Sequence, residues 1–371
     1  MENKHIAQLD GLRFYAILMI MVAHWLQWQW TNTILTKIPF VHGVILFFVL
    51  SGFLISNILF TNKENYNIQN LSKLPLLKNF YIRRVLRIFP IYYLIIIFLF
   101  IINYDNTRSV FPWLISYTSN IYQSVNNVDI GNFNHFWSLA VEEQFYLLWP
   151  LLILFTKSKK SLLIIILTII IALISKSSLY FFFDNWRATS YITLSCMHAL
   201  GLGALLSYFV TYNKKFTAKL SKSIWIYSSL FLYLSLQIIQ VVLKANWYKE
   251  IFDEFIFAIF ASLVVLKASN NGFTGFKKII FENKFVCYSG KVSYGLYVFH
   301  LFIPSLVLWV VPDVIIFNSK FAFSKYLLFV TYYIITFVFA HFSFKYIESP
   351  INNLKNKFPY FPKNTKIEDL K

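Results

Sequence analysis

The sequence predicts an all-α, polytopic membrane protein with about ten transmembrane helices and both termini in the cytoplasm. Three observations predict this class: 58% of the 371 residues are hydrophobic, 20% are aromatic and only 13% are charged. No soluble domain of this size could bury so much apolar surface, so lipid must form part of its solvent. The apolar residues also gather in runs that are long enough to cross the hydrocarbon core of a bilayer as helices.

Ten such runs occur along the chain. They lie at about residues 12–30, 41–61, 84–102, 135–156, 161–181, 191–211, 223–243, 252–268, 292–311 and 326–346. The longest predicted outer loop, about 103–134, contains a half-apolar stretch from Phe111 to Tyr122. This stretch is too short to span the bilayer, and we expect a re-entrant or interfacial helix there.

The positions of the basic residues predict the orientation. If the N-terminus is cytoplasmic, most Lys and Arg residues fall in the loops on that side, which are 62–83, 157–160, 212–222, 269–291 and the tail. Positive charge concentrates on the cytoplasmic side in this way in many membrane proteins. The net charge of +18 therefore reflects topology, and no nucleic-acid partner is expected. We predict a membrane domain at 1–351 and a surface-lying or solvated cytoplasmic tail at 352–371.

The first candidate functional residues are Arg13 and His24, in an apolar segment at the start of the chain. His24 lies eleven residues after Arg13, which in a helix is a rise of roughly 16 Å, or about half of the bilayer core. If Arg13 marks the cytoplasmic edge, His24 lies near or just beyond the membrane midplane. Ionisable groups at that depth are costly and commonly functional. The alternative is a neutral histidine that is hydrogen-bonded between helices.

Arg84 and Arg87 lie at the inner end of the third predicted span. They are three residues apart and therefore share a helical face. Two guanidinium groups on one face suit a phosphate or pyrophosphate, which a cytosolic cofactor could bring to them. The alternative is a positively charged anchor that contacts anionic lipid.

Ser138, Glu142 and either Phe145 or Tyr146 share one face of the span that enters from the outer side. Glu142 lies roughly 10 Å from the outer boundary, close to the depth inferred for His24. A carboxylate there needs a partner, and a histidine–carboxylate pair would set the tautomer and basicity of the imidazole. The alternative is that Glu142 and Glu143 hold Arg or Lys groups in a structural network.

The ninth predicted span contains Ser293, Tyr297 and His300 on one face, with Tyr294 beside them. Their hydroxyl groups could position a sugar, or they could form polar contacts between helices. In the second span, Ser51 and Gly52 permit close helix packing, and the alternative is that they line a substrate path. The remaining histidines show no metal-ligand spacing, so no metal site is expected.

Together these features resemble the acyltransferase 3 family of integral-membrane acyltransferases, whose bacterial members modify surface and secreted carbohydrates. The resemblance covers about residues 6–351. It rests on Arg13 with His24, the RxxR of Arg84 and Arg87, LFFVLSGFLI at 46–55, WSLAVEEQFYLLWP at 137–150, SYGLYVFH at 293–300 and ESP at 348–350. The family implies about ten spans in the bacterial cytoplasmic (inner) membrane. It also implies a catalytic base at His24 with Arg13 in the same essential pair.

By the same resemblance, Arg84 and Arg87, with help from Arg13, would hold acyl-CoA, and Glu142 would belong to the catalytic site. Ser138, Tyr146, Tyr294 and His300 are the expected substrate-binding residues. Two departures stand out. Ile45 occupies a position where many members have Asp or another small polar residue. The chain also ends soon after ESP, so we expect a stand-alone form without the esterase-like domain that is fused to some members.

The predicted function is therefore membrane O-acyl transfer. An acyl group, with acetyl as the default, would move from cytosolic acyl-CoA to a hydroxyl of a cell-surface or lipid-linked polysaccharide such as lipopolysaccharide. His24, oriented by Glu142 or Asp10, would activate the hydroxyl or carry the acyl group itself. The first alternative is a transporter or exporter of a polysaccharide or its precursor, disfavoured because no paired halves with broken spans are evident. The second is a non-catalytic scaffold.

Overall fold

The computed structural model describes residues 6–26, 38–183, 185–310 and 323–361. All regular elements within these ranges are helical, which confirms the all-α prediction. Seven helical segments are long and apolar enough to cross a membrane, or eight if one bent pair counts as a single span. The multi-pass class is therefore confirmed, whereas the count of ten spans and the cytoplasmic location of the termini stay predictions.

The long helices follow the predicted apolar runs. They are α1 (Ala7–Trp25), α2 (Gly43–Ile68), α3 (Leu74–Ile102), α6 (Phe136–Phe155), α7 (Ser158–Phe183), α9 (Thr193–Tyr212), α11 (Ser223–Leu243), α13 (Glu254–Ser269) and α19 (Phe323–Ser343). The ninth run is divided into α16 (Ser293–Phe299) and α17 (Phe302–Val310). The runs at 12–30 and 252–268 coincide with α1 and α13. These two helices do not belong to the seven segments that are long and apolar enough to cross a membrane. Residues 27–30 of the first run lie outside the described residues.

Short helices connect these elements. They are α4 (Thr107–Ile115), α5 (Ser119–Asn126), α8 (Trp186–Tyr191), α10 (Lys214–Leu220), α12 (Asn246–Tyr248), α14 (Phe276–Glu282), α15 (Lys284–Lys291) and α20 (Ser349–Asn353), together with η3 (Phe40–His42), η4 (Tyr104–Asn106), η5 (Gly131–Phe133), η6 (Lys249–Asp253), η7 (Phe344–Glu348) and η8 (Leu354–Lys357).

The predicted outer loop at 103–134 holds two short α-helices, α4 and α5, where one helix was expected. Tyr117 lies between them with φ of 52°, a left-handed conformation that cannot continue a helix.

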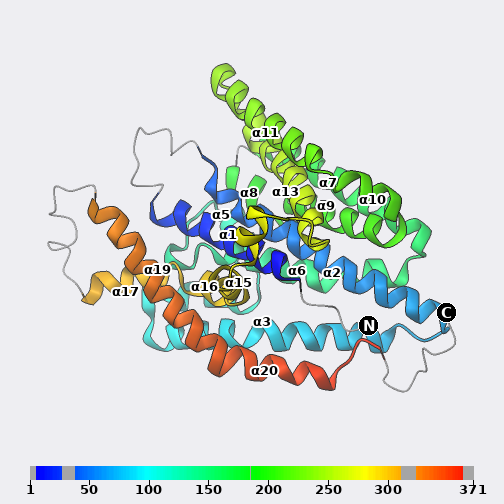
Figure 1. Ribbon diagram of the computed structural model, residues 1–371. Coiled ribbons are helices and arrows are strands. Elements are labelled where there is room, and N and C mark those ends of the chain that lie inside the picture. Colours follow the sequence, from blue (N-terminus) through cyan, green and yellow to red (C-terminus); the bar gives the residue numbers. More distant parts are fainter. Residues whose placement is uncertain (1–5, 27–37, 184, 311–322, 362–371) are drawn as a thin grey trace.

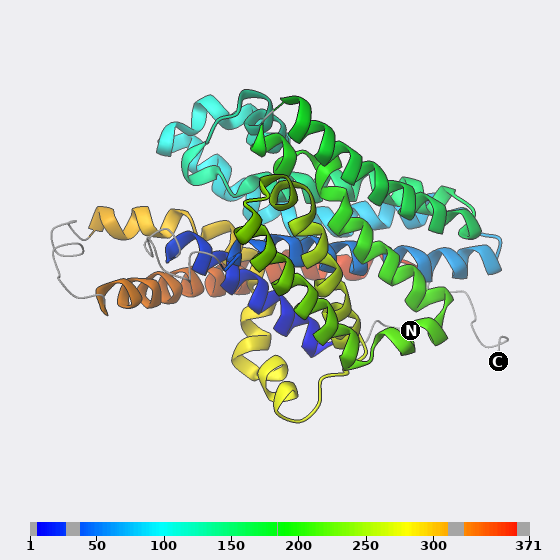
Figure 2. The same ribbon diagram turned by 90° about the horizontal axis from the view of Figure 1, so that it is seen from above.

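The helices form layers around α1, α2 and α6. Figure 1 shows these three between a group formed by α7, α9, α11 and α13 and a second group formed by α3, α19 and α20. In Figure 2, α14 and α15 lie beside α1. Much of the apolar surface of α11, including Phe231, Val242 and Leu243, is exposed. That surface is expected of a helix that faces lipid.

The closest helix contact joins α2 to α9. A Cβ atom on Gly52 would overlap the backbone carbonyl of Leu200, and one on Gly203 would overlap the carbonyl of Val49. Both glycines are therefore required by the short distance between the two backbones, since any larger residue would push the helices apart. The packing role predicted for Gly52 is confirmed.

Helix α3 starts ten residues before the third predicted span. Proline at the second position of the helix suits a helix start because its missing N–H would have no partner there. Arg84 and Arg87 consequently lie within a continuous helix instead of at its end. The sequence prediction placed the start too late because Lys78, Asn79 and Arg83 interrupt the apolar residues at the beginning of α3.

The ninth span is bent by 58° between α16 and α17. The break falls at His300 and Leu301, and Pro304 follows in the first turn of α17. Proline has no N–H, so it cannot donate to the carbonyl of His300 four residues earlier. This single bend was not predicted from the sequence, in which no paired halves with broken spans were evident.

The described part of the predicted tail packs against the membrane domain. Arg83 Nη1 donates to the carbonyl oxygens of Lys355 and Phe358, both at 3.0 Å. Tyr66 on α2 donates to the carbonyl oxygen of Tyr360 at 3.0 Å. Residues 354–361 therefore cover the ends of α2 and α3 next to the arginines.

Candidate active site

A cavity of about 190 Å³ lies among α1, α2, α3, α6 and α16. Seven of the nine predicted site residues line it. These are Arg13, Arg84, Arg87, Ser138, Glu142, Tyr146 and Tyr294. Because they come from four separate sequence motifs, their meeting in one cavity is a property of the fold. Their individual roles stay predictions.

Arginine side chains give the cavity its positive charge. Arg84 extends over the rings of Phe80 and Tyr146, with its central carbon 5.4 Å and 5.9 Å from their centroids. Its buried Nε atom has no hydrogen-bond partner. Among the described residues, neither Arg84 nor Arg87 forms an ion pair within 4.0 Å, whereas Arg13 pairs with Asp10 at 2.5 Å. Two guanidinium groups without a paired carboxylate suit an anionic ligand.

Glu142 is held by two hydroxyl groups. Ser51 Oγ donates to Glu142 Oε1 at 2.8 Å, and the Tyr146 hydroxyl donates to Oε2 at 3.1 Å. Ser51 comes from α2, and Tyr146 lies one turn further along α6. These hydrogen bonds orient the carboxylate toward the cavity, and they do not connect it to His24.

His24 and His300 form a pair outside this cavity. His24 Nδ1 lies 2.9 Å from His300 Nε2, and neither residue lines the cavity. Tyr297 lines the cavity and also contacts His300, with the ring centroids 5.3 Å apart. The Tyr297 hydroxyl lies 2.5 Å from Ser138 Oγ and donates to the carbonyl oxygen of His135 at 2.8 Å. Tyr297 therefore contacts both the arginine-lined cavity and the histidine pair, and Ser138 is its hydrogen-bond partner in the cavity.

Some residues that line the cavity were not among the site residues predicted from the sequence. Glu143 lines the cavity beside Glu142, as do Ser51, Ser293 and Tyr297. The motif that contains Tyr297 and His300 was recognised, but local spacing does not show which of its hydroxyls reaches the cavity. Tyr294 reaches α3, where its hydroxyl donates to the carbonyl oxygen of Ile88 at 2.8 Å.

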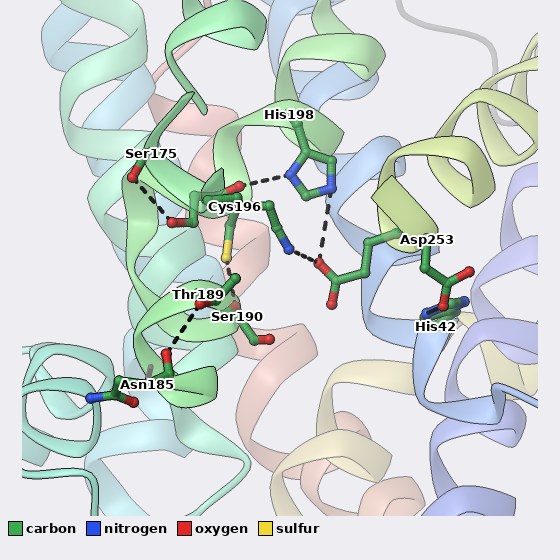
Figure 3. A network of polar contacts seen from close by, with 11 residues as sticks. His42, Ser175, Asn185, Thr189, Ser190, Cys196, His198 and Asp253 are labelled. Atoms are coloured by element: carbon green, nitrogen blue, oxygen red, sulfur yellow. Dashed lines mark hydrogen bonds and ion pairs between the residues drawn. The ribbon is translucent and has the colours of Figure 1, made fainter. Parts of the chain in front are cut away.

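A second polar cluster lies among α7, α9, α13 and the start of α2 (Figure 3). Lys176 pairs with Glu254 at 2.5 Å, and His42 pairs with Asp253 at 3.3 Å. His198 Nε2 lies 4.0 Å from Glu254. No member of this cluster lines the cavity. Among the described residues no group of His, Cys, Asp and Glu has the arrangement of a metal site, so the charges of the cluster stabilise one another.

The fold and the site define a class of protein: a polytopic helical membrane protein with an arginine-lined cavity, a hydroxyl-bound carboxylate and a histidine pair beside it. The chain belongs to the acyltransferase 3 family, because the family model described as "Acyltransferase domain" matches residues 6–352. This match confirms the resemblance noted in the sequence.

Several relatives carry names that describe their chemistry. The chain is 35% identical over 168 residues to peptidoglycan O-acetyltransferase OatA of Listeria monocytogenes, which covers 41% of this chain and 25% of the relative. It is 37% identical over 169 residues to O-acetyltransferase OatA of Staphylococcus aureus, with the same coverage. It is also 31% identical over 172 residues to putative peptidoglycan O-acetyltransferase YrhL of Bacillus subtilis, covering 41% of this chain and 24% of that protein. The matched stretch thus spans about a quarter of these relatives. No solved structure matches the chain.

Proposed function

We propose that this protein is a membrane O-acetyltransferase of the bacterial cytoplasmic membrane. It moves an acyl group, by default acetyl, from cytosolic acyl-CoA to a hydroxyl of a cell-surface or lipid-linked polysaccharide. The observation that carries the proposal is the convergence of Arg13, Arg84, Arg87 and Glu142 on one cavity of a chain that belongs to an acyltransferase family. The names of the relatives favour a peptidoglycan-type glycan as the acceptor.

In this proposal the arginines bind the phosphates of the donor. Acyl-CoA carries phosphate groups at one end and the thioester at the end of a flexible arm. Arg84 and Arg87 face the cavity without a direct carboxylate partner, so they are free to form bidentate hydrogen bonds with phosphate oxygens. The arm then extends toward Ser138 and Tyr297, on the side of the cavity nearest His24.

His24 acts as the base. It removes the proton from the acceptor hydroxyl, the hydroxyl oxygen bonds to the thioester carbonyl carbon, the carbon–sulfur bond breaks, and the CoA thiolate receives the proton. Alternatively His24 Nε2 first bonds to the thioester carbonyl carbon and CoA leaves as the thiolate; the acceptor hydroxyl then displaces the imidazole, and its proton passes to the thiolate. Either route brings the thioester to the side of the cavity where Tyr297 contacts His300.

The test uses the purified full chain in proteoliposomes, with labelled acetyl-CoA and glycan fragments as acceptor. We expect acetylated glycan from the wild type and a loss of about 10² to 10⁴ in rate from His24→Ala, the usual cost of losing a general base. Arg84→Lys should raise the KM for acetyl-CoA, because an ammonium group is only a point charge.

The outcomes separate the alternatives. Full activity of His24→Ala would remove this residue from the mechanism, and an unchanged KM for Arg84→Lys and Arg87→Lys would favour the lipid-anchor interpretation. Labelled acetyl retained on the protein without acceptor would favour the covalent route. The broken span α16–α17 also fits a carrier. Glycan movement across the vesicle membrane without acyl-CoA would support that second candidate.

A further inference from the structure

We propose that His300 is a positioning residue that fixes the tautomer of His24, so that His24 presents an unprotonated Nε2 as the base. This inference rests on the proposed role of His24. It gives His300 a different task from the substrate contact expected from the sequence. Three sets of observations carry it: the hydrogen bonds of the two rings, their geometry, and the contacts that hold His300.

The hydrogen bonds show which ring nitrogen of His300, and then which ring nitrogen of His24, carries the proton. His300 Nδ1 lies 2.7 Å from the carbonyl oxygen of Tyr297. A carbonyl oxygen only accepts, so His300 Nδ1 carries the proton, and a neutral imidazole has no second one. His300 Nε2 is then an acceptor, and His24 Nδ1, 2.9 Å away, must donate to it. His24 Nε2 is left with its lone pair, which is the form that a general base requires.

Both rings are neutral in this arrangement. A charged imidazole buried without a carboxylate is costly, and neither ring forms an ion pair with a carboxylate within 4.0 Å in the described part of the chain. A charged His300 would also donate from both nitrogens and reverse the direction of the bond to His24.

The orientation of the rings supports a real hydrogen bond. The two planes differ by only 19°, and the ring centroids are 5.0 Å apart while the nitrogens are 2.9 Å apart. The rings therefore meet edge to edge, because face-to-face rings would bring the centroids closer together. In this arrangement the N–H bond of His24 points along the lone pair of His300.

The surrounding residues hold His300 in place. Its side chain is 0% exposed, and the His135 ring stands against it at 75° with the centroids 4.7 Å apart. Trp25 Nε1 donates to the carbonyl oxygen of His300 at 3.1 Å. This is the carbonyl that Pro304 leaves without a helical partner. The break in the ninth span thus fixes the backbone and the ring of His300 together.

His24 differs from His300 in its surroundings. It is partly exposed, and no hydrogen bond to its Nε2 is found among the described residues. The nitrogen that the chain of hydrogen bonds leaves unprotonated is therefore also the one without a hydrogen-bond partner in the described part of the chain.

The test compares His300→Phe, which keeps a planar ring but no nitrogen, with His300→Gln, whose side-chain oxygen can accept from His24 Nδ1. His341→Phe is the matched control, because it makes the same substitution at a histidine that contacts the Tyr288 hydroxyl and neither His24 nor His300. We expect kcat to fall about 10²-fold in His300→Phe, the lower end of a general-base effect. The KM for acetyl-CoA should stay unchanged, because His300 does not line the cavity. His300→Gln should recover part of kcat, and His341→Phe should stay near the wild type.

A second measurement does not depend on activity. The ¹⁵N resonances of histidine-labelled protein, with His24 assigned through His24→Gln, should show His24 protonated at Nδ1 in the wild type. They should show it largely protonated at Nε2 in His300→Phe. An unchanged tautomer together with full kcat in His300→Phe would overturn the inference, and a raised KM for the glycan with unchanged kcat would restore the substrate contact. If the wild type transfers no acyl group, the proposed function fails, while the ¹⁵N measurement still decides the tautomer.

Discussion

At the scale of single residues, the carboxylate of Glu142 shows how a buried charge is fixed without an arginine in direct contact. Two hydroxyl groups, from Ser51 and Tyr146, donate to its two oxygens. Hydrogen bonds to a charged group are stronger than those between neutral groups, so this pair stabilises the ionised carboxylate and its orientation. Glu143, in the same cavity, has no such donors among the described residues.

We therefore predict that Glu142→Gln lowers kcat for acetyl transfer about 10²-fold, because the amide group of Gln presents its own N–H to one of the two donors. The affinity for acetyl-CoA should not fall, since the substitution removes negative charge from an arginine-lined cavity. Steady-state kinetics and calorimetric titration with CoA would measure both effects. Glu143→Gln removes the same charge and is the matched control. Equal losses from the two variants would show that charge matters and the hydroxyl contacts do not.

The sequence predicted the polar residues of the cavity but missed the partner of His24. Arg84, Arg87 and Glu142 are recognisable because charged residues within apolar helices are rare. The pairing of His24 with His300 depends on how two distant helices meet, and spacing within one segment carries no information about it. For the same reason Ser51 was interpreted as a packing residue, although it also binds Glu142.

At the scale of helices, the contact between α2 and α9 is set by two glycines that face each other's backbone. Ser51 is next to one of them, so the packing of α9 fixes the position of a hydroxyl in the cavity. We predict that Gly203→Val lowers the stability of the protein by about 1–3 kcal/mol or more, the usual effect of overpacking. Acetyl transfer should also fall, because α2 carries Ser51.

Thermal unfolding in detergent and the transfer assay would measure these effects. Thr61→Val, at an exposed position of α2, is the control and should change neither property. If Gly203→Val unfolds at the temperature of the wild type, then the helices can separate without loss and the close contact is not required.

Helix positions were predicted well from apolar runs, and helix ends less well. The predicted run at 223–243 coincides with α11, whose own exposed side chains are mostly large and apolar. The start of α3 was placed too late because Lys78, Asn79 and Arg83 interrupt its apolar residues, and the division of the ninth span was missed. Pro304 is present in the sequence, but proline occurs both in the first turn of a helix and at a break within one. The sequence alone therefore did not show that the helix ends before Pro304 and a new one begins.

At the scale of the whole molecule, the protein contains two separate groups of buried polar residues. One surrounds the cavity, and the other joins α7, α9 and α13 to the start of α2 (Figure 3). The second group was not predicted, because Lys176, His198 and Glu254 come from three different spans. Its opposite charges pair within the cluster, so they link α7, α9 and α13 to the start of α2.

We predict that Lys176→Met destabilises the protein by about 3–5 kcal/mol, because Glu254 loses its ion-pair partner while it remains within the protein. The double variant Lys176→Met with Glu254→Gln should recover much of this loss, since no unpaired charge remains. Unfolding midpoints in detergent would show both effects. Folded Lys176→Met protein should still bind CoA with wild-type affinity. A loss of CoA affinity in folded protein would instead connect the cluster to the cavity.

The hydroxyl contact between Tyr297 and Ser138 has a consequence for the proposed transfer. Tyr297 lines the cavity and its ring also contacts His300. A movement of this one side chain would therefore change the surroundings of the arginines and of the histidine pair together.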